Sequence, residues 1–294
     1  MKRTRSGKRI ELTERDLAIF RLLRQYRYLR STYIHAFVGG ASETRLKERL
    51  GDLFHEGYLD RPSKQWEFAD GRHRPAVHDI GAGAVRALRE AGGTYGDART
   101  FLSEAAHRQF QHSLMICEVL ASLDLAIRAD PLLRFIAWPE MLARAPEATR
   151  QSPAPFRLPV PSGGFLVPDG LFGIEYRGGD IKAYRFFALE ADRGTMPVAR
   201  STHGQSSYLA KLARYREVLQ NQIFKTHLRL PNLIVLTVTE DPDRLASIIG
   251  SMIGPEPTFL FKHASASNLA SPMRSLLQTA WQRAGLAPLA IDTP

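Results

Sequence analysis

Residues 232–238 read Asn-Leu-Ile-Val-Leu-Thr-Val, and this run constrains the fold more than any other part of the chain. The run is apolar and rich in β-branched residues, and it does not alternate with polar side chains. A strand of this kind must be covered on both faces, so it suits the centre of a sheet between helices. The second half of the chain is therefore predicted to hold a layered α/β domain.

The segments around this run fit the same architecture. Strands are expected at 135–138, 165–172, 183–192 and 258–261, and helices at 205–228, 241–252 and 273–284. Residues 144–164 are rich in proline, alanine and serine, which is typical of loops and hairpin connections. Together these segments predict a sandwich of helices around a mixed sheet.

The first third has a different pattern, of short helices followed by a hairpin. Thr13 is expected to cap a first helix, Gly39 with Gly40 to break a second, and Ser42 to cap a third that ends at Gly57. A short strand at 58–61, a polar tip, a returning strand at 76–80 and a helix at 81–92 follow. This order of elements predicts a winged helix-turn-helix, and the whole chain is expected to be α+β.

The charge is concentrated in the same third. The chain carries 40 Lys and Arg against 30 Asp and Glu, and residues 1–96 hold 19 of the former and 12 of the latter. The excess indicates a polyanionic partner, and duplex DNA is the expected one. The alternative is a charge excess that only keeps the protein soluble.

Fifteen side chains are candidate DNA contacts. Five belong to a basic N-terminal arm, expected to be disordered and able to reach phosphates or a minor groove: Lys2, Arg3, Arg5, Lys8 and Arg9. Six belong to the third helix: Ser42, Thr44, Arg45, Lys47, Glu48 and Arg49. Four lie at the hairpin tip: Lys64, Arg72, His73 and Arg74. Arg45 is expected to read a guanine while Lys47 and Arg49 hold phosphates, unless these charges only solvate a surface.

Three domains are expected: a DNA-binding domain over 1–96, a connecting long helix within 97–130, and the α/β domain over 131–294. The connecting helix either links the two domains or forms a dimer seam. The single cysteine, Cys117, lies in an apolar run and is expected to be a buried, inert thiol. It fits a reducing cytoplasm, and no apolar stretch is expected to span a membrane.

Two carboxylates in the α/β domain stand in a recognisable sequence pattern. Asp169 comes after a proline on one strand and Glu190 stands near the end of the next, before a helix and a buried strand. This pattern resembles the core of the PD-(D/E)XK nucleases. The resemblance implies that Asp169 and Glu190 bind Mg²⁺, with Asp192 as a further ligand. The chain departs from the family pattern at Asp192, which stands where the family has its lysine.

Lys211 is the candidate to replace that lysine. On the predicted helix 205–228 it lies at the edge of the apolar stripe, close to Tyr208 and Tyr215, from where it can reach back to the carboxylates. In the alternative reading its ammonium group passes the stripe and ends in water. The candidate catalytic set is therefore Asp169, Glu190, Asp192 and Lys211.

Most of the chain also resembles the replication-relaxation family of plasmid and mobile-element proteins. The segments that carry this resemblance are 12–16, 46–58, 189–195 and 208–215. It implies an accessory or regulatory DNA-binding role in plasmid replication, relaxation or transfer.

Two other functions stay open beside that role. One is a Mg²⁺-dependent endonuclease that the winged helix directs to its target. The other is a scaffold for dimerisation or recruitment with an inactive nuclease-like domain. The expected partners are double-stranded DNA, a second copy of the chain and replication or relaxation proteins, and the expected cofactor is none, or Mg²⁺ for an active nuclease.

Overall fold

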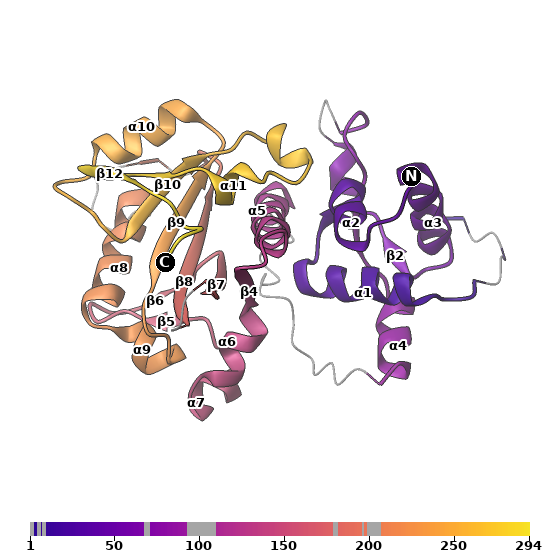
Figure 1. Cartoon of the computed structure of the whole chain (residues 1–294), viewed down its shortest axis with the longest axis horizontal. Coiled ribbons are helices and arrows are strands. Elements are labelled where there is room, and N and C mark those ends of the chain that lie inside the picture. Colours follow the sequence, from indigo (N-terminus) through magenta and orange to yellow (C-terminus); the bar gives the residue numbers. More distant parts are fainter. Residues whose placement is uncertain are drawn as a thin grey trace. The chain divides into compact units, whose positions relative to one another are not determined.

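A computed structural model describes residues 3–4, 7, 10–67, 71–92, 110–178, 182–195, 197–198 and 207–294. The fold is α+β (Figure 1). The chain divides into two compact units, and each is described by itself. The first unit comprises Met1–Leu125 and Ser267–Met273, and the second comprises Ala126–Ala266 and Arg274–Pro294.

The first unit begins with helices and a small antiparallel sheet. Its helices in this part are α1 (Glu14–Tyr26), α2 (Ser31–Val38), α3 (Glu43–His55) and α4 (Ala82–Glu90), with a 3-10 turn η1 (Ser63–Trp66). Its strands are β1 (Leu29–Arg30), β2 (Leu59–Asp60) and β3 (Val77–Ile80), paired in the order β1-β3-β2. The three helices, the hairpin and the fourth helix agree with the predicted elements. Strand β1 was not predicted, because two residues are too short a pattern to indicate a strand.

The predicted helix ends are present. Thr13 forms a capping box with Asp16, and the Ser42 hydroxyl accepts a hydrogen bond from the Arg45 amide at 3.2 Å. Gly57 has φ +86°, as expected just beyond a helix end. Gly81 is required for a different reason, because a Cβ there would lie 2.7 Å from the Gly57 carbonyl oxygen.

Helix α5 (Phe110–Arg128) is fixed to the first unit by buried polar contacts. The Arg30 guanidinium pairs with Glu118 at 2.5 Å, the Tyr26 hydroxyl donates to Asp124 at 2.5 Å, and Ser122 lies 3.0 Å from the Tyr33 hydroxyl. By length and composition alone, its 19 residues could cross a membrane. Most of the helix is buried within the protein, however, as core helices are.

A segment from late in the chain completes the first unit. The 3-10 turn η3 (Asn268–Ala270) lies in it, and the Leu269 carbonyl lies 2.9 Å from the Tyr33 hydroxyl. The Ala270 carbonyl accepts a hydrogen bond from Thr32 at 2.9 Å. The sequence order alone does not predict that these residues join the N-terminal helices.

The second unit is built on a seven-stranded mixed sheet of order β12-β11-β10-β9-β8-β7-β4, counted over the described residues. Its strands are β4 (Leu133–Ala137), β7 (Gly170–Tyr176), β8 (Ala183–Asp192), β9 (Ile234–Thr239), β10 (Phe259–His263), β11 (Trp281–Arg283) and β12 (Leu286–Leu289). Among the strands that the structure describes in this sheet, only β8, β9 and β10 run parallel to one another. As predicted, β9 lies inside the sheet, where five of its six residues are buried.

Helices and a small hairpin surround this sheet, with α8 and α10 beside it (Figure 1). The helices are α6 (Trp138–Arg144), α7 (Glu147–Gln151), α8 (Tyr208–Gln220), α9 (Ile223–Leu228), α10 (Pro242–Gly250) and α11 (Ser275–Gln278). The hairpin pairs β5 (Leu158–Pro159) with β6 (Phe165–Leu166).

Three predicted elements of this unit are wrong in extent or type. The helix expected at 273–284 is the short α11 followed by strand β11, which pairs with β10. The single helix expected at 205–228 is α8 and α9, separated at Gln222, whose φ of 53° no α-helix can contain. The strand expected at 165–172 is split into β6 and β7.

Candidate functional site

Two acidic side chains lie at the same end of neighbouring strands in the second unit. Asp169 immediately precedes β7 and Glu190 lies on β8, and the register pairs Gly170 with Leu189. The Asp169 carboxylate accepts a hydrogen bond from the amide of Ala191 at 2.9 Å. The turn into β7 thus holds one carboxylate beside the strand that carries the other.

Helix α8 brings a lysine and a tyrosine to the same place. Lys211 and Tyr215 stand four residues apart on one side of this helix, which begins at the Ser207 cap. The Lys211 ammonium group hydrogen-bonds Glu190 and lies 3.7 Å from the Asp169 carboxylate, and the Tyr215 hydroxyl donates to the other oxygen of Glu190. Lys211 therefore faces the carboxylates, although it retains 27% of its side-chain exposure.

The sequence predicts an apolar stripe through Leu209, Leu212, Leu219 and Ile223, with Tyr208 and Tyr215 beside it, and the buried face of α8 differs slightly from that stripe. Its buried members are Tyr208, Leu212, Tyr215 and Val218, whereas Leu209 is half-buried. The two tyrosines thus belong to the face that meets the sheet, where the Tyr208 hydroxyl hydrogen-bonds Thr237 of β9. This rotation of the helix is what directs Lys211 inward.

Burial changes the protonation of this cluster. Burial, reinforced by the nearby charge of Asp169, raises the pKa of Glu190 to about 8, although Lys211 and Tyr215 act in the opposite direction. Burial disfavours the charged form of Lys211, but Asp169 and Glu190 outweigh it and raise the pKa of this lysine. Burial also raises the pKa of Tyr215 well above its usual value. Glu190 is thus poised to exchange a proton near neutral pH.

Asp192 is held elsewhere. Arg244 of α10 makes two hydrogen bonds to its carboxylate, one of them 2.9 Å long from Nη2, and both side chains are nearly buried. Within the described part of the chain no group of three or more His, Cys, Asp or Glu side chains is arranged to hold a metal ion. The structure therefore does not place Asp192 as the third ligand that the sequence suggested.

Asp169 and Glu190 fit a divalent cation as a pair. Both carboxylates already face one positive group, the Lys211 ammonium. Mg²⁺ prefers such oxygen ligands, takes one or two carboxylates and keeps several waters. These two side chains are the ones that would hold the ion.

The exposed side of α3 carries part of the predicted DNA-binding set. Thr44, Arg45 and Glu48 are exposed, and Lys47 is exposed while pairing with Glu43 at 2.9 Å. Ser42 is half-buried and caps the helix.

Arg49 has a different role from the predicted phosphate contact. Its guanidinium hydrogen-bonds both oxygens of Asp16, at 3.0 and 2.6 Å, and the Glu11 carbonyl at 2.7 Å. These contacts attach α3 to the beginning of α1. Arg49 therefore fixes the orientation of the helix.

The predicted disordered arm is wrong for Arg3. Its guanidinium donates to the carbonyls of Phe54 and Leu59 at 2.9 and 2.8 Å and pairs with Asp60. This side chain therefore closes the end of α3 against β2. Lys2, Arg5, Lys8 and Arg9 lie outside the described residues.

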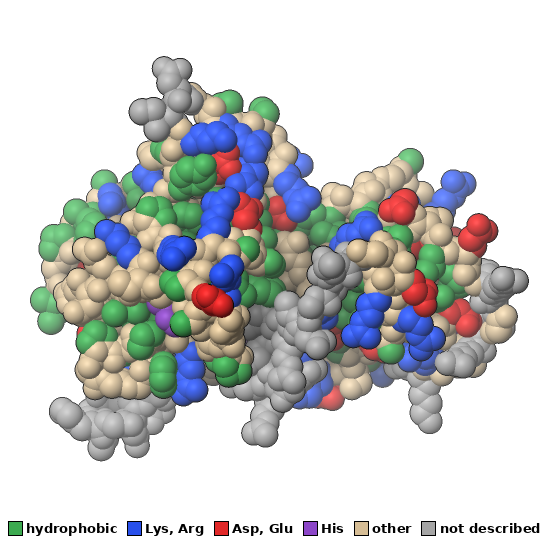
Figure 2. All heavy atoms as spheres, turned by 90° about the horizontal axis from the view of Figure 1, so that it is seen from below, with side chains coloured by type: hydrophobic (Ala, Val, Ile, Leu, Met, Phe, Trp, Pro, Cys, Tyr) green, Lys and Arg blue, Asp and Glu red, His purple; other side chains and the backbone are tan. Residues whose placement is uncertain are grey.

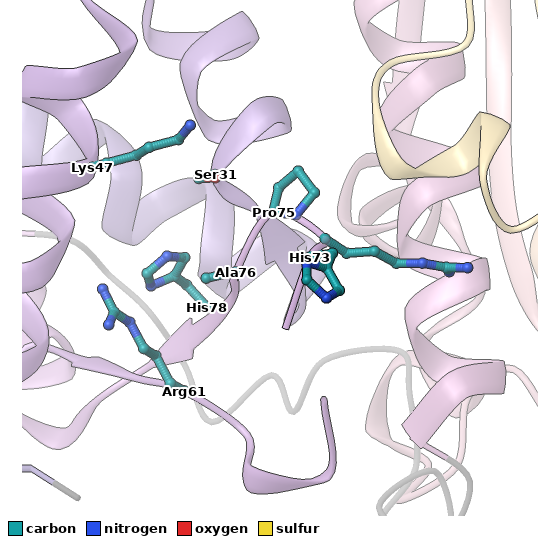
Figure 3. A pocket seen from close by; sticks show the side chains of 8 residues that line it. Ser31, Lys47, Arg61, His73, Pro75, Ala76 and His78 are labelled. Atoms are coloured by element: carbon teal, nitrogen blue, oxygen red, sulfur yellow. The ribbon is translucent and has the colours of Figure 1, made fainter. Parts of the chain in front are cut away.

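At the hairpin, Lys64, Arg72 and His73 are exposed and Arg74 is half-buried. Two of them line a cavity of about 350 Å³ in the first unit (Figure 3). We call it the basic cavity, and its lining residues are Ser31, Lys47, Arg61, His73, Arg74, Pro75, Ala76 and His78. Arg61 and His78 belong to the predicted strands at 58–61 and 76–80, and nothing in the sequence pattern marks them or Ser31 as binding residues.

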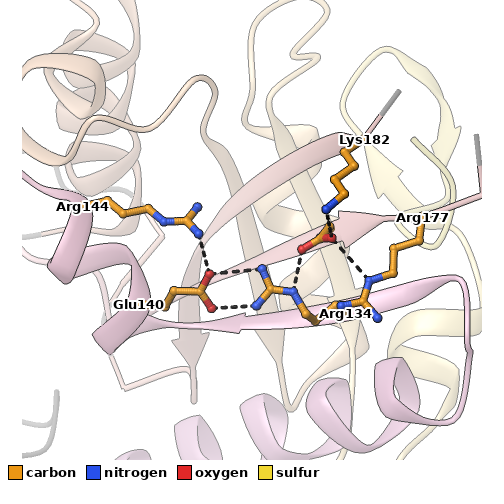
Figure 4. A network of polar contacts seen from close by, with 6 residues as sticks. Arg134, Glu140, Arg144, Arg177 and Lys182 are labelled. Carbon is orange, nitrogen blue, oxygen red and sulfur yellow. Dashed lines mark hydrogen bonds and ion pairs between the residues drawn. The ribbon is translucent and has the colours of Figure 1, made fainter. Parts of the chain in front are cut away.

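Basic side chains are not confined to the first unit. In the face drawn in Figure 2, Lys and Arg are spread over both parts of the molecule, with acidic side chains among them. Figure 4 shows one such group, where Arg134 of β4 bridges Glu140 at 2.7 Å and the buried Glu175 at 2.6 Å. Its acids are paired within the group, so it fastens the edge strand β4 to β7.

Comparison with known proteins identifies the family. Neither the search of curated proteins nor the search of solved structures found a match. The replication-relaxation family model matches residues 20–233, which include the second half of α1, the helices α2 to α9, the lining of the basic cavity and the Asp169–Glu190–Lys211 cluster. This match spans well over half of the chain, and the chain accordingly belongs to the replication-relaxation family.

Proposed function

We propose that this protein binds double-stranded DNA through its first unit and acts as an accessory factor or regulator in the replication, relaxation or transfer of a mobile element. The observation that carries the proposal is the order of elements α1-β1-α2-α3-β2-β3 with the sheet order β1-β3-β2. This order supports the assignment of a winged helix-turn-helix. In such domains the third helix enters the major groove.

The contacts of α3 support this role. Arg49 and Asp16 attach the helix to α1, so its N-terminal half presents Thr44, Arg45 and Glu48 on a rigid support. An arginine there matches the O6 and N7 acceptors of guanine, and Lys47 is placed to meet a phosphate. A homodimer would read two half-sites, and the partners would include replication or relaxation proteins in the cytoplasm.

A second function is favoured by one observation, the convergence of Asp169, Glu190 and Lys211. We infer a Mg²⁺-dependent DNA endonuclease with a PD-(D/E)XK-like core, in which α8 supplies the lysine that β8 lacks. The ion, when bound, would polarise the scissile phosphate and lower the pKa of water. Asp169 and Glu190 would hold the ion, Lys211 would orient the attacking oxygen, and Tyr215 would fix the Glu190 carboxylate.

One experiment tests both functions. The full chain is incubated with supercoiled and linear DNA, with and without Mg²⁺ or Mn²⁺, and gels are read for mobility shift and for cleavage. The variants are Arg45→Ala, Glu190→Gln and Lys211→Ala. Lys225→Ala removes an exposed lysine of the same unit and serves as the control.

A shift that Arg45→Ala weakens supports DNA binding through α3, and the absence of any shift contradicts it. Metal-dependent cleavage that Glu190→Gln and Lys211→Ala abolish, and Lys225→Ala retains, supports the nuclease. A shift without cleavage leaves the accessory role alone.

A further inference from the structure

The basic cavity has the charge of an anion site. Lys47 comes from α3, Arg61 follows β2 and Arg74 precedes β3, so three cationic residues from separate elements line it. None of the eight described lining residues is acidic. Figure 3 shows Lys47 on one side of the cavity and Arg61 and His78 on another. A cavity with this lining attracts negative charge.

Two buried polar atoms in the wall lack a partner. Ser31 and His78 are each 1% exposed, and Ser31 Oγ and His78 Nδ1 have no hydrogen-bond partner among the residues that the structure describes. Buried polar groups are nearly always satisfied, and exceptions indicate a ligand or a functional role. Burial beside Arg61 lowers the pKa of His78 to about 3, so the imidazole is neutral and can donate one hydrogen bond and accept another.

The size of the cavity suits more than a simple ion. Its volume of about 350 Å³ lies within the range of about 300–1,000 Å³ that is usual for small-molecule sites. A phosphate group with part of its attached sugar therefore fits inside.

The depth of Ser31 and His78 decides which kind of phosphate can reach them. A phosphodiester in the middle of a duplex carries a sugar on each side and runs along a protein surface. A terminal phosphate has one substituent only and can enter a cavity end-on.

We propose that the basic cavity binds a terminal phosphate group, carried either by a nucleotide or by the end of a DNA strand. Lys47 and Arg61 supply positive charge, and His78 and Ser31 supply hydrogen bonds at the wall. Lys47 also belongs to the exposed side of α3, so an occupied cavity withdraws this lysine from a DNA backbone. Binding of a phosphate in the cavity does not require duplex binding, so free phosphates can test the site without DNA.

The test is titration calorimetry of the full chain with inorganic phosphate and with adenosine 5′-monophosphate. The variants are Lys47→Ala and His78→Gln. Arg86→Ala removes an exposed arginine of the same unit that does not line the cavity, and it serves as the control. Loss of a charged hydrogen bond to phosphate weakens binding about tenfold, which is the expected effect of each cavity variant. Lys47 is on the surface, so its variant remains informative even where His78→Gln does not fold.

Hairpin duplexes with a single 5′ end, either phosphorylated or not, distinguish the two sources. Tighter binding of the phosphorylated hairpin that Lys47→Ala abolishes assigns the site to strand ends. Nucleotide binding with no such difference between hairpins assigns it to a free nucleotide. The proposal is overturned where wild type binds none of these probes at millimolar concentration, or where the control variant loses as much affinity as Lys47→Ala.

Discussion

Glu190 shows at the level of one residue how position sets chemistry. Its carboxylate is almost completely buried, and another carboxylate, Asp169, faces the same ammonium group. Both features disfavour its charge and raise its pKa to about 8. A carboxyl group with such a pKa accepts or releases a proton near neutral pH. A divalent ion bound to Glu190 would favour the charged form of this carboxyl group.

Replacing Glu190 by glutamine should change how stability depends on pH. The unfolded carboxyl ionises near its usual pKa of about 4.3, whereas the folded one holds its proton to about pH 8. Between these values the folded state binds more protons, so the stability contributed by this proton falls as pH rises. Glu190→Gln cannot titrate and should not show this fall, which we expect to be on the order of 4 kcal/mol between pH 5 and pH 8.

Urea unfolding at pH 5 and pH 8 measures this difference. Of the three tryptophans, Trp138 and Trp281 belong to the second unit, so fluorescence in a Trp66→Phe background reports on that unit. Glu147→Gln removes an exposed carboxylate of the same unit as a control. The same pH dependence in wild type and in Glu190→Gln would contradict the prediction.

The Asp192–Arg244 pair gives a second prediction for single residues. Arg244→Ala leaves a nearly buried carboxylate without its guanidinium, and we expect it to lower the free energy of unfolding by about 3 kcal/mol. The double variant with Asp192→Asn should recover part of this loss, because no buried charge remains. Urea unfolding of Arg244→Ala, Asp192→Asn and the double variant measures this recovery. A double variant that loses as much stability as the two single variants together would refute the coupling.

At the scale of elements, the caps and the pairs between helices decide how α3 is presented. Thr13 and Asp16 cap α1, and the same Asp16 holds Arg49 of α3. Burial opposes the ionisation of Asp16, but its hydrogen bonds with Arg49 and Thr13 outweigh that effect and lower its pKa. One aspartate thus begins one helix and orients another.

Thr13→Ala should loosen the beginning of α1. The variant loses the hydroxyl that caps the Asp16 amide, a contact worth about 1 kcal/mol. Hydrogen exchange of the first-turn amides of α1 should therefore accelerate several-fold. Thr13→Ser keeps the hydroxyl and should exchange as wild type does, and equal protection in all three proteins would show that the cap contributes nothing.

At the scale of the whole molecule, the two units carry separate chemistry and call for separate measurements. The first unit has the exposed side of α3 and the basic cavity, and the second has the Asp169–Glu190–Lys211 cluster. DNA binding and cation binding can therefore be changed one at a time.

The salt dependence of DNA binding tests the first unit. Each phosphate contact contributes about −0.9 to the slope of log K against log salt concentration. Lys47→Ala should reduce the magnitude of this slope by about one, whereas Arg45→Ala should mainly relax the base preference. Fluorescence anisotropy with labelled duplexes measures both, and a slope unchanged by Lys47→Ala would exclude a phosphate contact there.

A divalent cation tests the second unit. Mg²⁺ at 100 times its dissociation constant should stabilise this unit by about 2.7 kcal/mol, because it binds the folded state alone. Glu190→Gln removes one ligand and should abolish most of the effect, and the chelator EDTA should reverse it in wild type. An equal response of wild type and Glu190→Gln would show that the ion binds elsewhere.

Much of this architecture could be predicted from the sequence, because it depends on local chemistry. The apolar, β-branched run at 232–238 required a central strand, and Thr13 and Ser42 marked helix starts by the hydrogen bonds that their own hydroxyls make. The spacing of Asp169 and Glu190 on successive strands indicated a carboxylate pair. Each of these signals is contained within a few residues.

Only the tertiary structure decided the rest, because it depends on pairs of residues far apart in the chain. Arg244 binds Asp192, which lies 52 positions away in the sequence. Arg49 binds Asp16 over a separation of 33 positions, and Arg3 binds Asp60 over a separation of 57. Residues 281–283 form a strand because β10 offers an edge for pairing, which their own pattern does not reveal. The orientation of α8 that points Lys211 toward Glu190 is likewise set by the burial of Tyr208 and Tyr215 against the sheet. The side of a helix that is buried depends on the elements that pack against it.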